Sequence, residues 1–337
     1  MKVPQLDLTE QYHSIKSEID PAIIKVLESG IAINGRNVKE LENSLAVYSD
    51  NKYGIGVANG SDALFIALKA LGIGQGVDVL VPTFTFFATA GSVVRAGATP
   101  VFIDIEEDSY NMCPMKLQEF INRDCVLDKN QQLLNKKTGH IIKALIPVHL
   151  FGQMCEMESI LQIAVKYNLK IVEDCAQSIG SEYKGKKAGS FGDLGTFSFF
   201  PTKNLGTYGD GGMLITSSPK VAEYCRVFRS HGSKPKYFHQ FVGINSRLDE
   251  LHAAILNIKF KYFEKMLKDR FQVACRYQDL FKKFHLLEKV RLPLEDIYHL
   301  KNHKEHTFHQ YVINVENRDK LQKYLEDDLL HTGRRII

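Results

Sequence analysis

The sequence lacks any run of apolar residues approaching the roughly 20 that a helix needs to cross a bilayer. No apolar stretch of signal-peptide length follows its first residues, Met1 to Asp7. Its six cysteines are scattered and form no CxxC pair, a pattern typical of reduced thiols buried as small apolar groups. These absences predict a cytoplasmic protein without a membrane span.

The sequence also has little net charge and no dinucleotide-binding motif. The 43 Lys and Arg residues nearly balance the 39 Asp and Glu residues, and a net charge of +4 spread along the chain does not indicate a nucleic-acid partner. The glycines of residues 72–76 do not follow the GxGxxG spacing, and they precede a predicted strand where that motif would follow one. An NAD-dependent oxidoreductase is therefore poorly supported, and a turn is expected there.

The composition that is present is that of a globular protein, with 44% hydrophobic and 24% charged residues. A chain of 337 residues exceeds one ordinary domain and predicts one large domain plus a smaller one.

Short β-rich runs alternate with helical stretches from residue 53 onward. Because the strands are apolar on both faces, the alternation predicts a mainly parallel sheet covered by helices. The predicted strands are 54–57, 78–81, 100–103, 144–148 and 170–173, and the helices between them are 61–71, 85–96 and 157–167. Ligands of such sheets bind beyond the carboxyl ends of the strands, where Asp174 stands.

The flanking segments give weaker patterns. Asp20 and Pro21 look like the N-cap and first turn of a helix that Gly30 ends, and residues 38–48 predict a second helix. The polar residues 122–140 predict a surface excursion. Helical periodicity returns over 249–286, and residues 309–315 predict a strand of a smaller α+β domain.

Two segments carry groups that suit one cofactor, pyridoxal phosphate (PLP). The strand ending at Asp174 is followed by Gln177, and a second apolar strand leads through Ser198 to Lys203. Lys203 offers an amine to the aldehyde, Asp174 a carboxylate that keeps the pyridine nitrogen protonated, and Gln177 a donor to the phenolic oxygen.

The remaining needs of the cofactor are met elsewhere in the sequence. Gly60 and Ser61 open a predicted helix, whose N-terminal N–H groups suit a phosphate. An aromatic face for the ring is available among Phe84, Phe86 and Phe87.

Five segments together resemble the DegT-type sugar aminotransferases, a branch of the fold-type I PLP enzymes. They are Ala-Asn-Gly-Ser-Asp-Ala-Leu (58–64), Pro-Thr-Phe-Thr-Phe (82–86), Glu-Asp-Cys-Ala-Gln-Ser (173–178), Ser-Phe-Phe-Pro-Thr-Lys-Asn-Leu-Gly (198–206) and Gly-Ile-Asn-Ser-Arg-Leu-Asp (243–249). The resemblance covers residues 5 to about 325. It implies a seven-stranded-type, mainly parallel sheet between helices in a large domain, 1–245, and a smaller C-terminal α+β domain, 246–337.

The resemblance also implies roles for individual residues. Lys203 binds the cofactor and shuttles the proton, Asp174 pairs with the pyridine nitrogen, and Gln177 supports the phenolic oxygen. The phosphate is held by Gly60, Ser61 and Ser198, with Asn245 from a neighbouring subunit of a homodimer; Phe86 stacks on the ring, while Arg247 and His309 lie on the substrate side. No metal is implied.

The resemblance implies a reaction in which L-glutamate donates its amino group to a nucleotide-linked keto-sugar for surface polysaccharide precursors such as those of lipopolysaccharide and O-antigen. The run 237–247 is closest to enzymes that aminate UDP-2-acetamido-3-keto-hexuronates, and relatives acting on dTDP-keto-6-deoxyhexoses share most of the motifs. A PLP-dependent sugar dehydratase is an alternative, although those relatives carry His at the position of Lys203. A PLP-binding regulatory protein without turnover is another, because the sequence departs from the family pattern after residue 325.

Some chemistry-bearing residues have plainer interpretations. His303, His306 and His309 recur every three residues, but no Cys or carboxylate completes a metal-ligand set, so packing or a substrate-side role is preferred. Cys175 has no matched His partner and is expected to be a buried thiol.

Overall fold

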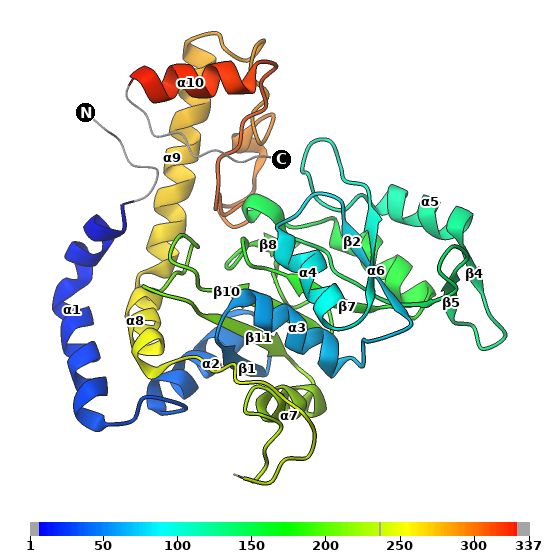
Figure 1. Cartoon of the computed structure of the whole chain (residues 1–337). Helices are drawn as coiled ribbons and strands as arrows, with labels where there is room; N and C mark the ends of the chain where they lie inside the picture. Colours follow the sequence, from blue (N-terminus) through cyan, green and yellow to red (C-terminus); the bar gives the residue numbers. More distant parts are fainter. Residues whose placement is uncertain (1–6, 236, 329–337) are drawn as a thin grey trace.

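The computed structural model describes residues 7–235 and 237–328 of the chain. Its centre is one sheet with strands in the order β1-β11-β10-β7-β6-β2-β3 (Figure 1). The pairs β10–β7, β7–β6, β6–β2 and β2–β3 are parallel, and β11 runs antiparallel between β1 and β10. The predicted mainly parallel sheet of the seven-stranded type is confirmed, and a hairpin described below extends these seven strands to nine. The strands of this path are β1 (Tyr53–Val57), β2 (Val77–Pro82), β3 (Thr99–Ile103), β6 (Ile141–Leu145), β7 (Lys170–Asp174), β10 (Leu194–Ser198) and β11 (Gly212–Thr216).

Both faces of the sheet are buried, as the apolar strands predicted. Val79 and Val81 of β2 enter one hydrophobic cluster, and Leu80 between them enters the other, because successive side chains of a strand point to opposite faces. One cluster is covered by α3 (Gly60–Ala70), α4 (Phe87–Arg95) and α7 (Pro219–Phe228). The other is covered by α2 (Arg36–Tyr48), α5 (Pro114–Asp124), α6 (Met157–Lys166) and α8 (Glu250–Lys261).

The prediction that a helix starts at Asp20 and Pro21 is wrong, because α1 is one helix from Leu8 to Ser29. Asp7 caps it instead, with its carboxylate accepting from the backbone N–H groups of Thr9 and Glu10. The helix continues through Pro21 because its apolar side, including Ile19, is packed against α8. Gly30 ends it with φ +65°, as predicted.

Residues 122–140 are also not a simple surface excursion. They contain the end of α5 and a hairpin of β4 (Cys125–Leu127) and β5 (Leu133–Asn135), which extends the sheet beside β6. Two polar residues of this segment serve a buried carboxylate. Asp78 in β2 accepts hydrogen bonds from Asn135 Nδ2 (2.8 Å) and Thr138 Oγ1 (2.7 Å). A separate short hairpin is formed by β8 (Glu182–Tyr183) and β9 (Lys186–Lys187).

The C-terminal part consists of helices and irregular chain in the described residues. The strand predicted over 309–315 is absent, and this segment makes a single bridge, between Arg291 and Asn314. The start of the segment instead hydrogen-bonds the turn at Phe151, where Gln310 N meets the Phe151 carbonyl at 3.3 Å. The helical elements are α8, α9 (Phe263–Lys283) and α10 (Arg318–Asp328), with short 3₁₀ turns at Ile297–His299 and, earlier, at Leu150–Gly152.

The division at residues 245 and 246 stays a prediction. The boundary falls just before α8, which packs against α1 and α2. The predicted departure from the family pattern after residue 325 falls largely on residues 329–337, which lie outside the described part.

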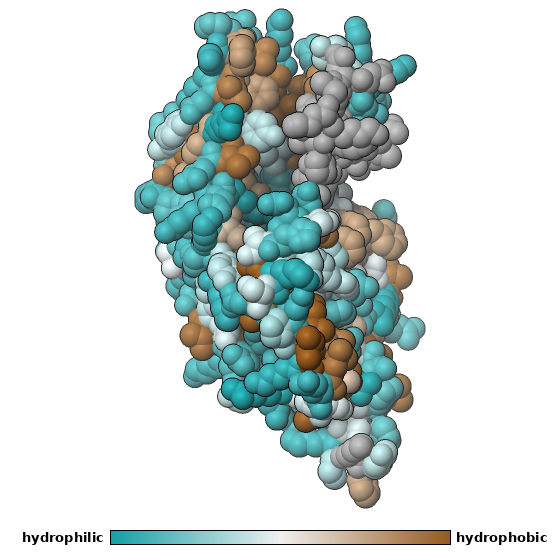
Figure 2. All heavy atoms as spheres, turned by 90° about the vertical axis from the view of Figure 1, so that its left-hand side faces the viewer, coloured by the Kyte–Doolittle hydropathy of each residue, from teal (hydrophilic) through white to brown (hydrophobic). Residues whose placement is uncertain are grey.

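The surface on the α1 side is mostly hydrophilic, with apolar side chains in separate patches (Figure 2). Among the described residues, no helix combines the length and the apolar character that a membrane span requires.

Candidate active site

The candidate site lies at the carboxyl ends of the parallel strands. Asp174 is the last residue of β7 and is paired in register with Thr196 of β10, so it lies near Ser198 at the end of β10. The sequence could predict this meeting, because the carboxyl ends of parallel neighbours lie on one edge of a sheet.

Asp174 is a buried carboxylate, 5% exposed. Its Oδ2 accepts from Thr89 Oγ1 of α4 at 2.8 Å, and its Oδ1 accepts from the backbone N–H of Ala176 at 3.1 Å. Burial raises the pKa of Asp174, while these two hydrogen bonds and the positive charge of Lys203 act in the opposite direction. A buried carboxylate held this way is suited to face a cationic group.

The end of β7 is fixed from the opposite face by Glu173. Its carboxylate accepts from the backbone N–H groups of Gly189, Phe191 and Gly192 at 2.7–2.9 Å and lies 3.0 Å from His149 Nε2. His149 Nδ1 accepts from the Cys155 N–H, so the ring proton sits on Nε2 and is donated to Glu173. This network anchors the strand that carries Asp174.

Cys175 and His306, one of the three spaced histidines, have plain structural roles. Cys175 is fully buried, as predicted, and burial raises the pKa of its thiol to about 12. The prediction that it has no His partner is wrong, because His149 lies beside it and acts against this shift of the pKa. Burial also lowers the pKa of His306 to about 3; its Nδ1 accepts from the Phe308 N–H and its ring stacks on Phe308. His309 makes a separate contact, with Asn204.

Lys203 lies in a tight turn between β10 and β11. Its backbone N–H donates to the Phe200 carbonyl at 2.9 Å, and the Thr207 N–H closes the turn on the Phe199 carbonyl at 2.8 Å. The side chain is half-buried and close enough to Asp174 for its charge to act on that carboxyl. The structure therefore brings together the lysine and the aspartate that the sequence singled out.

A close approach between the start of α3 and the end of β10 depends on glycine. A Cβ on Gly60 would lie 2.8 Å from Ser198 Cβ, and one on Gly212 would lie 2.4 Å from the carbonyl carbon of Asn59. Asn59 caps α3 through the Asp62 N–H, which leaves the first N–H groups of the helix, at Gly60 and Ser61, without intrahelical acceptors. The predicted phosphate residues Gly60, Ser61 and Ser198 thus form one corner.

Gln177 and the aromatic residues lie around the same strand ends. Gln177 Oε1 accepts from the Phe151 N–H at 2.8 Å, which directs its amide nitrogen to the other side. Phe84 packs in a cluster with Tyr110 and Phe151, whereas Phe86, the residue preceding α4, is 71% exposed. Phe84 is therefore part of the hydrophobic packing, whereas the exposed ring of Phe86 remains available to stack on a bound ring.

The outer predicted residues are placed differently from one another. His309 is buried and its Nδ1 lies 3.3 Å from Oδ1 of Asn204, the residue after Lys203. Arg247 is half-buried, and its Nε is buried without a hydrogen-bond partner among the described residues. Asn245 is exposed and makes a backbone bridge with Ser230.

Three contributing residues escaped the sequence interpretation. Thr89 holds Asp174, Asn204 joins the lysine turn to His309, and Phe151 orients Gln177. Only Thr89 had a local signal, because Thr85 and Thr89 stand four residues apart, and their hydroxyls lie 2.8 Å from each other. The other two depend on residues more than 20 positions away.

A family model described as the DegT/DnrJ/EryC1/StrS aminotransferase family matches residues 13–334 of the chain. The chain is 46% identical over 332 residues to the "Pleiotropic regulatory protein" of Geobacillus stearothermophilus, covering 98% of this chain and 83% of that protein. It is 41% identical to the "dTDP-3-amino-3,6-dideoxy-alpha-D-galactopyranose transaminase" of Aneurinibacillus thermoaerophilus, covering 98% and 84%. It is 38% identical to the "UDP-2-acetamido-2-deoxy-3-oxo-D-glucuronate aminotransferase" of Pseudomonas aeruginosa, covering 95% and 82%.

Solved structures give the same result. An aminotransferase of this description from Brucella abortus has a TM-score of 0.87 and 37% identity, covering 97% of this chain and 82% of that one. The Bacillus subtilis protein ntda, solved with the bound cofactor PMP, has a TM-score of 0.84 and 29% identity, covering 97% and 70%.

Proposed function

Because the chain belongs to the DegT/DnrJ/EryC1/StrS aminotransferase family, whose cofactor is PLP, we propose that it transfers the amino group of L-glutamate to a nucleotide-linked keto-sugar. The proposal rests on the proximity of three groups. The charge of Lys203 acts on the buried carboxylate of Asp174, and the N-terminus of α3 lies against the end of the neighbouring strand β10. An amine, a carboxylate and an anion-binding helix end in one corner are the groups that PLP requires.

The residues fit the cofactor by the chemistry of their donors. Asp174 would pair with the pyridine nitrogen, since a cation there offsets the cost of burying its charge. Gln177 would donate to the phenolic oxygen. The phosphate would be held by Gly60, Ser61 and Ser198, and Phe86 would cover one face of the ring.

When bound, PLP supplies an electron sink for the carbon that gains or loses a proton. In the proposed cycle Lys203 Nζ accepts the α-proton of glutamate and later donates a proton to the sugar carbon that receives nitrogen. Thr89 and the Ala176 N–H donate to the two oxygens of Asp174 and so favour its charged form against the effect of burial.

The proposed acceptor is a nucleotide sugar with a ketone at C3. Support comes from two relatives, one named as a 3-oxo-glucuronate aminotransferase and one as a 3-amino-3,6-dideoxy-sugar transaminase. A UDP-2-acetamido-3-keto-hexuronate is proposed first and a dTDP-keto-6-deoxyhexose second, as precursors of surface polysaccharide. Arg247, whose Nε has no hydrogen-bond partner among the described residues, would meet an anionic group, and His309 would lie on the substrate side.

The first experiment replaces Lys203 with Ala. The PLP-loaded wild type should show the absorption band of lysine-bound cofactor near the visible edge, and the variant should lose it. Lys261→Ala is the control, because that exposed lysine pairs with Glu18 of α1. An unchanged spectrum in Lys203→Ala would end the proposal; a panel of keto-sugar nucleotides with mass detection would then identify the acceptor.

A second candidate is a PLP-binding regulatory protein without turnover, favoured by the name of the 46% identical relative. Glutamate alone separates the two. Conversion of the cofactor spectrum to the aminated form supports the enzyme, and no conversion supports the regulatory protein. The sugar dehydratase is disfavoured, because Lys203 stands where those relatives carry His.

A further inference from the structure

Lys259 is a buried lysine that the proposed reaction does not use. It lies in α8 and is 1% exposed. Its Nζ donates to the carbonyl of Gly206 at 2.8 Å and lies 4.0 Å from the centre of the Tyr208 ring. Within residues 7–235 and 237–328, no carboxylate forms an ion pair with it.

Burying an ammonium group without a carboxylate costs stability. The Gly206 carbonyl and the face of Tyr208 replace only part of its hydration, and burial lowers the pKa of Lys259 to about 8. An apolar side chain of similar length would avoid this cost. The position of the amine therefore calls for an explanation other than the stability of the core.

The contacted carbonyl belongs to the turn that carries Lys203. Gly206 follows Lys203 by three residues and is tightly enclosed, since a Cβ there would lie 2.6 Å from both the Phe200 and Pro201 carbonyl oxygens. The turn also approaches α8 at Gly209, where a Cβ would lie 2.8 Å from the His252 ring, but Lys259 is the residue of α8 that donates a hydrogen bond to the Gly206 carbonyl. This donor therefore helps to fix how far the lysine turn lies from α8.

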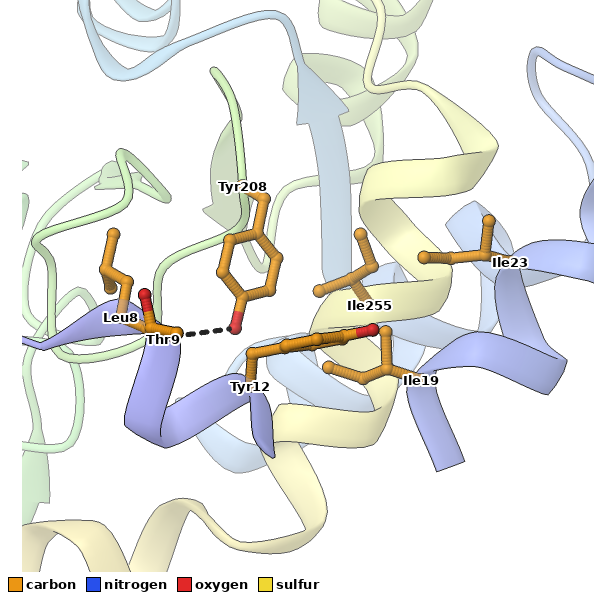
Figure 3. Close-up of a pocket in the computed structure, with 7 residues that line it drawn as sticks. All are labelled: Leu8, Thr9, Tyr12, Ile19, Ile23, Tyr208 and Ile255. Atoms are coloured by element: carbon orange, nitrogen blue, oxygen red, sulfur yellow. Dashed lines mark hydrogen bonds between the residues drawn. The ribbon is translucent and has the colours of Figure 1, made fainter. Parts of the chain in front are cut away.

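Tyr208 completes the contact from the outer side. Its hydroxyl donates to the Leu8 carbonyl at the start of α1 at 3.4 Å. Figure 3 shows its ring projecting into the cavity between α1 and α8, near Tyr12 and Ile255. The cavity has a volume of about 410 Å³ and leaves Tyr208 37% exposed, whereas the amine of Lys259 contacts the ring from the buried side chain of α8.

We propose that Lys259 is a positioning residue, whose amine holds the Gly206 carbonyl so that the turn presents Lys203 to the cofactor in a fixed place. The inference rests on the proposed function for the role of Lys203. Its effect on the turn, however, exists without cofactor and can be measured separately.

The test compares Lys259→Met, which keeps the length and removes the donor, with Lys259→Arg, which restores a cationic donor. Lys261→Met on the same helix is the control. Sodium borohydride fixes PLP to the amine that holds it, and peptide mass mapping then gives the rate at which Lys203 captures the cofactor. We expect capture to slow about tenfold in the Met variant and to return to within about threefold in the Arg variant.

Two further measurements separate positioning from ordinary packing. Without cofactor, hydrogen exchange in residues 199–208 should be about tenfold faster in Lys259→Met, because the Gly206 carbonyl loses its partner. Its unfolding midpoint should equal or exceed that of the wild type.

The outcomes that contradict the proposed function differ from those that contradict the role of Lys259. Wild-type protein that fixes no PLP at Lys203 contradicts the proposed function, while the exchange data still test Lys259. If the Met variant captures PLP at the wild-type rate, unfolds at a lower temperature, or is matched by an equally slow Arg variant, Lys259 is a packing residue and the inference is wrong.

Discussion

At the scale of single residues, Thr89 is one of the groups that favour the charged form of Asp174. The hydroxyl of Thr89 reaches Asp174 Oδ2 from α4, 85 positions earlier in the chain, and this hydrogen bond works against the burial that raises the pKa of Asp174. A neutral carboxyl would no longer favour a protonated ring nitrogen. The hydroxyl is thus expected to matter for turnover more than for cofactor binding.

Thr89→Val removes that hydroxyl with little change of shape. The pKa of Asp174 should rise further, so its carboxyl takes up a proton at higher pH than in the wild type. The acidic limb of the plot of kcat against pH should therefore move to higher pH. At neutral pH we expect kcat to fall about tenfold. Steady-state rates with glutamate across the acidic range measure both effects.

Thr89→Ser is the matched control, because it keeps the donor. It should restore the wild-type profile to within about twofold. If the Val and Ser variants have the same acidic limb, the hydroxyl does not control the charge of Asp174.

The proximity of two candidate residues could be predicted where each of them stands beside a strand end. Lys203 and Asp174 could be found because each stands beside a strand end and the strands are neighbours in the sheet. Asn204 could not, since its contact with His309 joins positions 105 apart and neither residue type is informative alone. Side chains that support a site through one long-range hydrogen bond leave no periodicity to detect.

At the scale of elements, the turn at Leu150–Gly152 connects the C-terminal segment with Gln177. Phe151 has φ +58° and Gly152 has φ +106°. The Gly152 carbonyl accepts from Ser181 Oγ at 2.8 Å and from the Thr307 N–H at 2.9 Å, while the Phe151 N–H holds Gln177. The conformation of this turn therefore decides where the amide of Gln177 points.

Gly152→Ala should disturb the turn strongly. Its Cβ would lie 2.8 Å from Thr307 Oγ1 and 2.9 Å from the His309 nitrogen, in a backbone region that side chains rarely adopt. We expect a loss of about 3 kcal/mol in unfolding free energy. Gly185→Ala is the control, because it has φ +81° and open space around the new Cβ, and should cost about 1 kcal/mol. Urea denaturation measures both; equal losses would mean that the contact with residues 307–309 is not tight.

Elements were predictable where two levels of pattern agreed. The strands β2, β3 and β7 are short, rich in apolar residues and next to a helix in the chain, so their assignment needed no tertiary information. The start of α1 was misplaced because the local preference of Pro21 for a first turn was overridden by packing on α8. The β4–β5 hairpin was missed because its polar residues serve the buried Asp78, which only the folded sheet reveals.

At the scale of the whole molecule, the proposed homodimer depends on Asn245. The residue is exposed, and no hydrogen bond of its side chain is formed within the described part of the chain. Its neighbour Ser246 is buried and accepts from the Ala58 N–H at 3.2 Å, so the backbone here is fixed while the Asn245 side chain faces outward. An outward amide on a fixed backbone is suited to complete a site on a second subunit.

Mixing two inactive variants distinguishes a site shared between subunits from a site formed by one subunit alone. Lys203→Ala and Asn245→Ala should each be nearly inactive alone. In a mixed dimer with shared sites, one site collects both substitutions and the other has none, so co-expressed equimolar chains should recover about a quarter of wild-type activity. If each subunit used its own Asn245, every site in the mixture would carry one defect and no activity would return. Wild-type chains mixed with Lys203→Ala provide the upper reference, and a mixture that stays as inactive as its parents would contradict the shared site while leaving Lys203 in place.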